Sequence, residues 1–195
     1  MLPNPVGYDR MYVHLDGELS YDTWWRGFKA GQVFISNGPL LRCRVNGQLP
    51  GHVFKSETGA ELNLRLEAMV DSRDPIVSID IIRDGRVIRT FSDSNWKLTG
   101  SLGSITFKES GWFLVRAIAA VPNTFRFGST GPFYIEVGPT SRRISRLSAR
   151  FFIDWVCERQ GQIRIANVQQ QTDVMAYHKK AEQFWKEKLT RANAD

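Results

Sequence analysis

The order of hydrophobic and polar residues from Leu19 to Leu41 predicts a helix followed by a short strand. Ser20 is a suitable N-cap before aromatic residues at helical spacing from Tyr21 to Phe28, and the apolar run Val33 to Ile35 follows. A further strand is expected within Tyr8 to Leu15. This order is typical of a strand–helix–strand unit from a parallel sheet, although only a part of such a sheet is present.

Residues 40–137 show the period-two pattern of antiparallel strands. From Glu61 to Val70 apolar and polar residues alternate cleanly, and Asn46-Gly47 and Asp84-Gly85 each predict a β-hairpin with a two-residue turn. The run Gly111 to Ala119 is apolar on both faces, which predicts a central strand. These features predict an immunoglobulin-like β-sandwich.

After residue 139 the pattern becomes helical. One helix is expected after Ser145 and ends near Gly161, and a second is expected from Thr172 through Leu189. Their apolar stripes are interpreted as core contacts. The predicted fold is mainly β (α+β), with three parts: residues 1–41 as the strand–helix–strand unit, 42–139 as the sandwich, and 140–195 as a helical extension packing on the sandwich. The stripes consist of Leu147, Phe151, Phe152, Trp155 and Val156 in the first helix, and Val174, Tyr177, Ala181, Phe184, Trp185 and Leu189 in the second.

Several short motifs occur along the chain in a recognisable order. They are Asn4-Pro5-Val6-Gly7-Tyr8, Ser20-Tyr21 with Trp24-Trp25, Ala30-Gly31-Gln32-Val33-Phe34, Asn37-Gly38-Pro39-Leu40-Leu41, Val45-Asn46-Gly47, Pro50-Gly51-His52-Val53-Phe54, Phe151-Phe152-Ile153-Asp154-Trp155-Val156 and Phe184-Trp185. In these motifs the chain resembles the C-terminal portion of PHP-type metal-dependent hydrolases, in the CehA/McbA-like branch of the polymerase and histidinol phosphatase superfamily. The resemblance covers nearly the whole chain.

In that family a distorted (β/α) barrel holds a metal cluster through His-x-His, further His and Asp residues, and a late Asp-x-His. Neither motif occurs here, and His14, His52 and His178 stand far apart. The resemblance therefore implies a non-catalytic accessory or structural domain that packs against or covers the catalytic barrel, in cis or in trans, with residues 1–41 as a remnant of the barrel end. The chain is therefore expected to contain no catalytic residues and no metal ligands, and to bind no cofactor.

The same resemblance places Ser36 and Asn37 at the end of a late barrel strand, in a loop close to the substrate. If residues 8–41 evolved to be covered by a barrel, they form a domain interface, or the interface of a homodimer. The interface residues expected on this argument are Tyr12, Val13, Trp24, Trp25 and Phe34. Two alternatives stay open: a free-standing module that binds a sugar or peptide on an aromatic platform, and a nucleic-acid-binding protein. The platform would come from Trp24, Trp25, Trp96 or Trp112.

The charge of the chain is concentrated at its C-terminal end. Of a net charge of +6, residues 140–195 supply most, with eleven Lys or Arg against six Asp or Glu. Such a surface can bind phosphates, but cations interspersed with acids on amphipathic helices more often face solvent, so nucleic acid is not the favoured partner. The basic residues concerned are Arg142, Arg143, Arg146, Arg150, Lys179, Lys180, Lys186, Lys188 and Arg191.

The two cysteines, Cys43 and Cys157, are interpreted as buried thiols rather than a disulfide. A catalytic pair with Cys43 as nucleophile and His52 as base is not favoured, because no third group that would orient the base is identifiable. No apolar run reaches the length of a membrane span, and the first residues lack the pattern of a signal peptide. The localisation stays open, since a longer parent protein could carry a leader.

Overall fold

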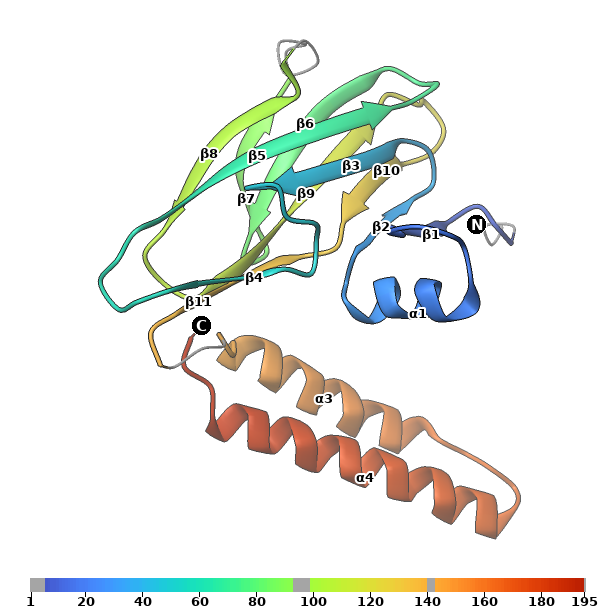
Figure 1. Cartoon of the computed structure of the whole chain (residues 1–195). Helices are drawn as coiled ribbons and strands as arrows, with labels where there is room; N and C mark the ends of the chain where they lie inside the picture. Colours follow the sequence, from blue (N-terminus) through green and yellow to red (C-terminus); the bar gives the residue numbers. More distant parts are fainter. Residues whose placement is uncertain (1–5, 93–98, 140–142, 195) are drawn as a thin grey trace. The chain divides into compact units, whose positions relative to one another are not determined.

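The computed structural model describes residues 6–92, 99–139 and 143–194, which fall into two compact units, residues 1–141 and 142–195. The first unit consists of strands and one helix, and the second of two helices (Figure 1).

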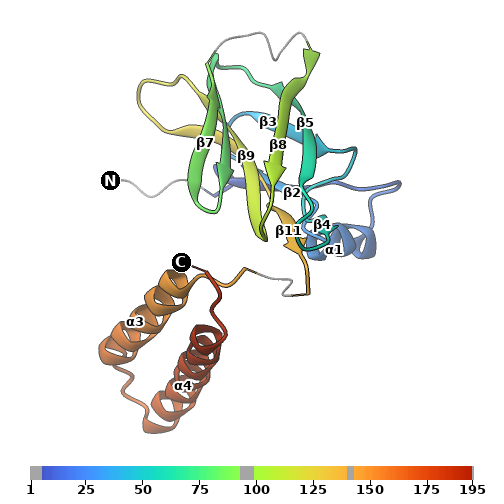
Figure 2. The ribbon, with the colours of Figure 1, turned by 90° about the vertical axis from the view of Figure 1, so that its left-hand side faces the viewer.

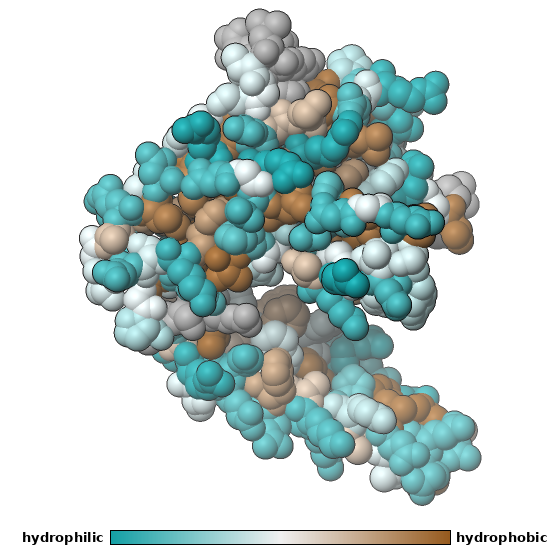
Figure 3. All heavy atoms as spheres, viewed as in Figure 1, coloured by the Kyte–Doolittle hydropathy of each residue, from teal (hydrophilic) through white to brown (hydrophobic). Residues whose placement is uncertain are grey.

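A three-stranded antiparallel sheet forms one layer of the first unit. Its order is β3-β5-β8, so β3 is an edge strand. On β5, Leu64, Leu66 and Ala68 are buried while Arg65 and Glu67 are exposed, as the alternation predicts. Hydrophilic side chains cover much of the outer face over β3 and β5 (Figure 3). The strands are β3 (Leu40–Val45), β5 (Leu62–Asp71) and β8 (Ser101–Phe107).

The second layer is a larger sheet with β9 at its centre, which confirms the predicted central strand. One edge of β9 pairs with β6 and through it with β7, and the other edge pairs with β10 and β11 in succession. Beyond these lie β2 and β1 on the β10 side and β4, parallel, beside β11. The strands are β1 (Arg10–Val13), β2 (Val33–Ser36), β4 (Val53–Ser56), β6 (Ile76–Arg83), β7 (Arg86–Phe91), β9 (Gly111–Ala119), β10 (Arg126–Thr130) and β11 (Phe133–Val137).

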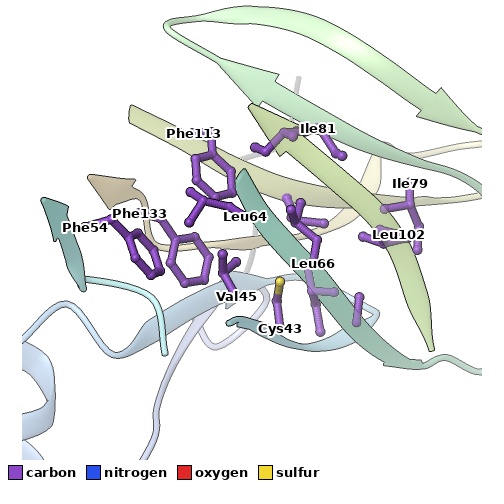
Figure 4. Close-up of a cluster of buried hydrophobic side chains, with 14 of the residues drawn as sticks. Cys43, Val45, Phe54, Leu64, Leu66, Ile79, Ile81, Leu102, Phe113 and Phe133 are labelled. Carbon is purple, nitrogen blue, oxygen red and sulfur yellow. The ribbon is translucent and has the colours of Figure 1, made fainter. Parts of the chain in front are cut away.

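This division of the strands, with β3, β5 and β8 opposite β7, β6, β9 and β10–β11, is that of an immunoglobulin-like sandwich. Figure 2 shows the two layers from the side. Their inner faces supply one core (Figure 4). The ring of Phe113 lies 5.2 Å from that of Phe133 and 5.5 Å from that of Phe107, measured between centroids. The prediction of a mainly β fold with an immunoglobulin-like sandwich and two C-terminal helices is confirmed.

Both turns form, but only Asp84-Gly85 closes a hairpin, and the hairpin predicted at Asn46-Gly47 is wrong. Asn46 and Gly47 have φ values of 46° and 77°, and Asp84 and Gly85 have 49° and 85°. Positive φ at both central residues defines the type I′ turn, whose twist matches that of antiparallel strands. Asp84-Gly85 joins β6 to β7, whereas Asn46-Gly47 is closed only by the pair Val45 and Gln48 before the chain leaves the smaller sheet.

The segment before the sandwich contains the predicted helix, α1 (Tyr21–Lys29), between β1 and β2. Ser20 caps it, with its side chain accepting a hydrogen bond from the Thr23 N–H. The expectation of a parallel sheet is wrong, because β1 and β2 pair antiparallel and β2 continues antiparallel onto β10. The segment containing α1 joins the end of β1 to the start of β2 where Val13 pairs with Val33, so the two strands run in opposite directions.

The second unit is a hairpin of α3 (Arg146–Gln162) and α4 (Val168–Thr190), which pack along one another. Phe152 stacks on Trp185 with ring centroids 4.3 Å apart. Within the hairpin much of each stripe is exposed, because a two-helix hairpin covers one face per helix. Cys157, expected to be buried, is exposed for the same reason. The expected packing of these stripes on the sandwich stays a prediction. The exposed members of the stripes are Leu147, Phe151, Trp155, Tyr177 and Phe184.

Candidate binding cleft

A cleft of about 750 Å³ lies in the first unit between the strands β1 and β2 and the edge strand β3. It falls within the size range of small-molecule and peptide-anchor pockets, and its walls are mainly apolar. The apolar lining residues include Tyr12, Val33, Phe34, Leu41, Leu49, Pro50 and Met69.

One wall of the cleft is an aromatic pair. Tyr12 and Phe34 are directly opposite in the β1–β2 ladder, and their rings stack with centroids 4.6 Å apart and planes 5° apart. Paired positions on neighbouring strands point to the same face of a sheet, which brings both rings to the cleft side. Val13, the next residue on β1, also lines the cleft.

The opposite wall is the edge of β3. Asn46 N–H donates to the Arg65 carbonyl oxygen at 2.9 Å, so the pairs 46:65, 44:67 and 42:69 are the hydrogen-bonded ones. The backbone groups of Leu41 and Cys43 must then point away from β5. Within the part of the chain that the structure describes, no strand pairs with this edge of β3.

The thiol of Cys43 lies at the cleft wall and is held neutral. Burial, followed by the negative charge of Glu67, raises the pKa of Cys43 from 9.0 to about 12. Figure 4 shows its sulfur among apolar side chains. His52, by contrast, is exposed and lies against the ring of Phe54 with centroids 4.6 Å apart. This arrangement does not activate Cys43 as a nucleophile.

The floor of the cleft is fixed by close backbone packing. Gly51 follows Pro50, donates its N–H to the Pro132 carbonyl oxygen at 2.8 Å, and has φ +88°. A Cβ at Gly51 would lie 1.9 Å from the carbonyl oxygen of Ala30, the C-cap of α1. Only glycine permits this approach, so the end of α1 and the floor of the cleft are positioned together.

The rim of the cleft carries polar groups. Arg42 forms an exposed ion pair with Asp71 at 2.8 Å, and Arg44 donates to the carbonyl oxygen of Gly47 at 2.9 Å. Glu67 lies opposite Arg44 on β5. The rim therefore offers charges of both signs around an apolar interior.

The structure separates the residues expected at an interface. Tyr12, Val13 and Phe34 lie in the cleft, whereas Trp24 and Trp25 lie on α1. The two tryptophan rings are 5.1 Å apart and pack with Phe28, and all three side chains are half-buried without belonging to the sandwich core.

Ser36 and Asn37, expected near a substrate, are buried with their side chains engaged by backbone. Ser36 donates its hydroxyl to the Pro39 carbonyl oxygen and accepts from the Gly38 N–H. Asn37 donates to the Phe125 carbonyl oxygen at 3.0 Å and accepts from the Phe127 N–H at 2.9 Å. Ser36 therefore stabilises the turn between β2 and β3, and Asn37 links that turn to the start of β10.

The remaining candidate residues of the sequence analysis do not form a common site in the described part of the chain. Among residues 6–92, 99–139 and 143–194, no three His, Cys, Asp or Glu side chains are close enough to hold a metal ion, and no helix is long and apolar enough to cross a membrane. Trp96 and Arg142 lie outside the described residues, and Trp112 is half-buried. On α4, Lys186 pairs with Glu182 and Lys188 lies 5.2 Å from the ring centroid of Phe184.

The sequence did not indicate the cleft lining on β3 and on the loop after it. Cys43 was recognised only as a buried thiol, and Leu49 and Pro50 belong to no periodic pattern. Asn46-Gly47 was interpreted as a hairpin turn, which would have given β3 a second neighbour. Among the described residues no strand pairs with β3 on that side, so the sequence did not predict this edge.

No protein-family model and no curated protein matches this chain. Among solved structures, the fibronectin(III)-like modules of Clostridium thermocellum CbhA are similar to it, with 20% sequence identity and a TM-score of 0.33. The match covers 49% of this chain and 46% of that chain, so this chain spans less than half of the length of that structure.

Proposed function

We propose that this chain is a non-catalytic accessory module that binds an extended polypeptide in the cleft beside β3. The observation that carries the proposal is the edge of β3 that no described strand pairs with, facing an apolar cleft of about 750 Å³. The partner that the sequence resemblance suggests is a metal-hydrolase barrel of the PHP type, in cis or in trans.

Binding would use strand addition. An added strand can pair with the backbone N–H and C=O groups of Leu41 and Cys43, which supplies affinity without reading sequence. One apolar side chain of that strand would enter the cleft between the Tyr12–Phe34 pair and Leu49. Arg44 and Glu67 at the rim favour a partner with charges beside this anchor.

The chemistry of the cleft supports a binding role. The thiol of Cys43 is protonated at neutral pH, so it is a poor nucleophile. Arg42, in the lining of the cleft, is paired with Asp71.

The peptide-binding part is tested with a phage-displayed random peptide library selected on the intact chain. We expect selected peptides to bind the wild type and Val87→Asp, whose residue is exposed away from the cleft, but not Leu49→Asp. Amide exchange should slow at Leu41 and Cys43 when peptide binds. Protection confined to α1, or equal binding by both variants, would contradict the proposal.

The hydrolase partner is tested separately. A barrel protein containing His-x-His and encoded next to this chain should form a one-to-one complex with the wild type and with Val87→Asp, but a weaker one with Leu49→Asp. A cleft that binds peptides but no such barrel would leave a free-standing peptide-binding module and reject the PHP parent.

A further inference from the structure

A second pocket of about 280 Å³ lies on the first unit where four chain segments meet. Arg10 comes from the start of β1, Asn37 and Gly38 from the turn between β2 and β3, Arg73 from the turn between β5 and β6, and Arg126 from the start of β10. Among the described residues of its lining Asp74 is the one acidic residue, so these residues carry an excess of two positive charges.

The guanidinium of Arg126 is held in place by its neighbours. The side chain of Asn37 binds the backbone of Phe125 and Phe127, on either side of Arg126, at 3.0 and 2.9 Å. Asp74 Oδ2 lies 2.7 Å from Arg126 Nη1. The backbone and the guanidinium of Arg126 are thus both fixed, and Asn37 is a positioning residue.

The donors of this cluster are not saturated. The Nε of Arg126 is buried and has no hydrogen-bond partner among the described residues, and an unsatisfied buried donor is unfavourable. The side chains of Arg10 and Arg73 have no ion-pair or hydrogen-bond partner in the described part of the chain, and both residues are exposed. Asp74 alone cannot satisfy three guanidinium groups, each with five N–H donors.

We infer that this pocket binds a phosphate-type dianion, such as the phosphate of a phosphomonoester. Planar guanidinium groups bind oxyanions through paired N–H donors, and three of them match a ligand with three peripheral oxygens. A carboxylate, with two oxygens and one charge, would leave the excess positive charge unbalanced. Tyr8 also lines the pocket, and its hydroxyl lies 2.7 Å from the hydroxyl of Thr124.

The test is calorimetric titration of the intact chain with inorganic phosphate at low ionic strength and pH about 8, where the dianion predominates. Acetate at matched ionic strength is the monoanionic comparison. We expect phosphate to bind, acetate to bind at least about tenfold more weakly, and the Arg10→Ala/Arg73→Ala variant to lose at least about tenfold in phosphate affinity. The control is Arg65→Ala/Arg86→Ala, which removes the same charge at exposed positions outside the pocket and should leave affinity unchanged.

Gly38→Ala tests the geometry without changing charge. Gly38 lies outside the left-handed region, and a Cβ there would lie 3.2 Å from the Cδ of Arg126, so the side chain of Arg126 must shift by a few tenths of an ångström. Weaker phosphate binding with an unchanged circular dichroism spectrum supports the site. Absence of phosphate binding, equal affinity for acetate, equal losses in both double variants, or full affinity in Gly38→Ala would overturn it.

Discussion

Asp80 on β6 and Arg116 on β9 lie opposite each other in the larger sheet, with Oδ2 of Asp80 2.8 Å from Nη2 of Arg116. The hydroxyl of Thr90 on β7 donates to Oδ1 of the same carboxylate at 2.9 Å. The Asp80 side chain is only 6% exposed. The paired, hydrogen-bonded carboxylate of Asp80 stabilises the register of β6, β7 and β9. If β6 slipped by one residue, its side chains would change faces and Asp80 would point into the core.

Asp80→Ala should therefore be strongly destabilising. Removing one partner of a buried ion pair leaves the other charge uncompensated, which costs about 3 to 5 kcal/mol in deeply buried cases; Arg116 is partly exposed, so we expect about 2 to 3 kcal/mol. Denaturant titration measures the loss in the free energy of unfolding.

The matched control is Asp71→Ala. Asp71 pairs with Arg42 at the same 2.8 Å, but both side chains are more than 60% exposed. We expect a change of less than about 1 kcal/mol, since solvent screens such pairs. Equal losses in the two variants would contradict the argument from burial.

Phe113→Ala tests the sandwich core. Phe113 is fully buried on the central strand β9 between Phe107 and Phe133, so truncation leaves a cavity that its neighbours cannot fill. We expect a loss of about 3 to 5 kcal/mol. Val87→Ala, at an exposed position on β7, should change stability by less than about 0.5 kcal/mol. A loss below about 1 kcal/mol for Phe113→Ala would mean that β9 is peripheral.

Period-two patterning predicted the strands that keep one buried face, and it failed where that period is broken. On β8, Leu102 and Ile105 are both buried although three positions apart, because the register with β5 shifts between Arg65 and Glu67. A bulge of this kind removes the alternation on which the sequence argument depends. β10 was also missed, because its buried residues Gly128, Ser129 and Thr130 are small or polar.

The cleft was less predictable than the fold. Tyr12, Val13 and Phe34 were expected at an interface because residues 8–41 were interpreted as a segment that a barrel covers, and that interface stays a prediction. In the structure the three residues line the cleft. The pairing of β2 with β10 decides which strand lies opposite these three residues. The contact between Asn37 and the backbone beside Arg126 joins segments about ninety residues apart. Local pattern carries no information on such juxtapositions.

The two cysteines should differ sharply toward thiol reagents. Cys157 is exposed, whereas burial raises the pKa of Cys43 to about 12. At pH about 8 we expect a thiol-specific reagent to modify Cys157 at once and Cys43 only after denaturation. Rapid modification of two thiols per native chain, counted by mass spectrometry, would contradict this.

The same shift predicts a pH dependence of stability. The folded pKa of Cys43 lies above 9.0, the usual value, so the folded state retains a proton that the unfolded state has lost. The stabilisation is present below about pH 9 and decreases as the pH rises toward 12. The difference in free energy of unfolding between wild type and Cys43→Ala should therefore shrink over this range. A constant difference would show that Cys43 does not titrate in this way.

Trp25→Glu tests the aromatic face of α1. Trp24, Trp25 and Phe28 pack mainly on one another outside the sandwich core, which is typical of a surface that a partner or a second copy covers. We expect concentration-dependent self-association of the wild type in light scattering and less of it in Trp25→Glu; Val87→Glu is the control. A strict monomer that Trp25→Glu affects in neither stability nor solubility would show that α1 is not an interface.

Gly51→Ala should lower both the free energy of unfolding and the affinity of the cleft for peptides. A Cβ at Gly51 would lie 1.9 Å from the Ala30 carbonyl oxygen at a φ of +88°, so both the clash and the backbone conformation oppose the change. We expect a loss of more than about 2 kcal/mol and weaker binding of cleft-selected peptides, because Pro50 moves with Gly51. Gly47→Ala separates the two effects, since φ there is +77° but nothing lies within 4 Å of the added methyl group. It should lose only about 1 kcal/mol and keep full peptide affinity. If both variants lose stability equally and retain peptide binding, the contact between the end of α1 and Gly51 does not position the cleft floor.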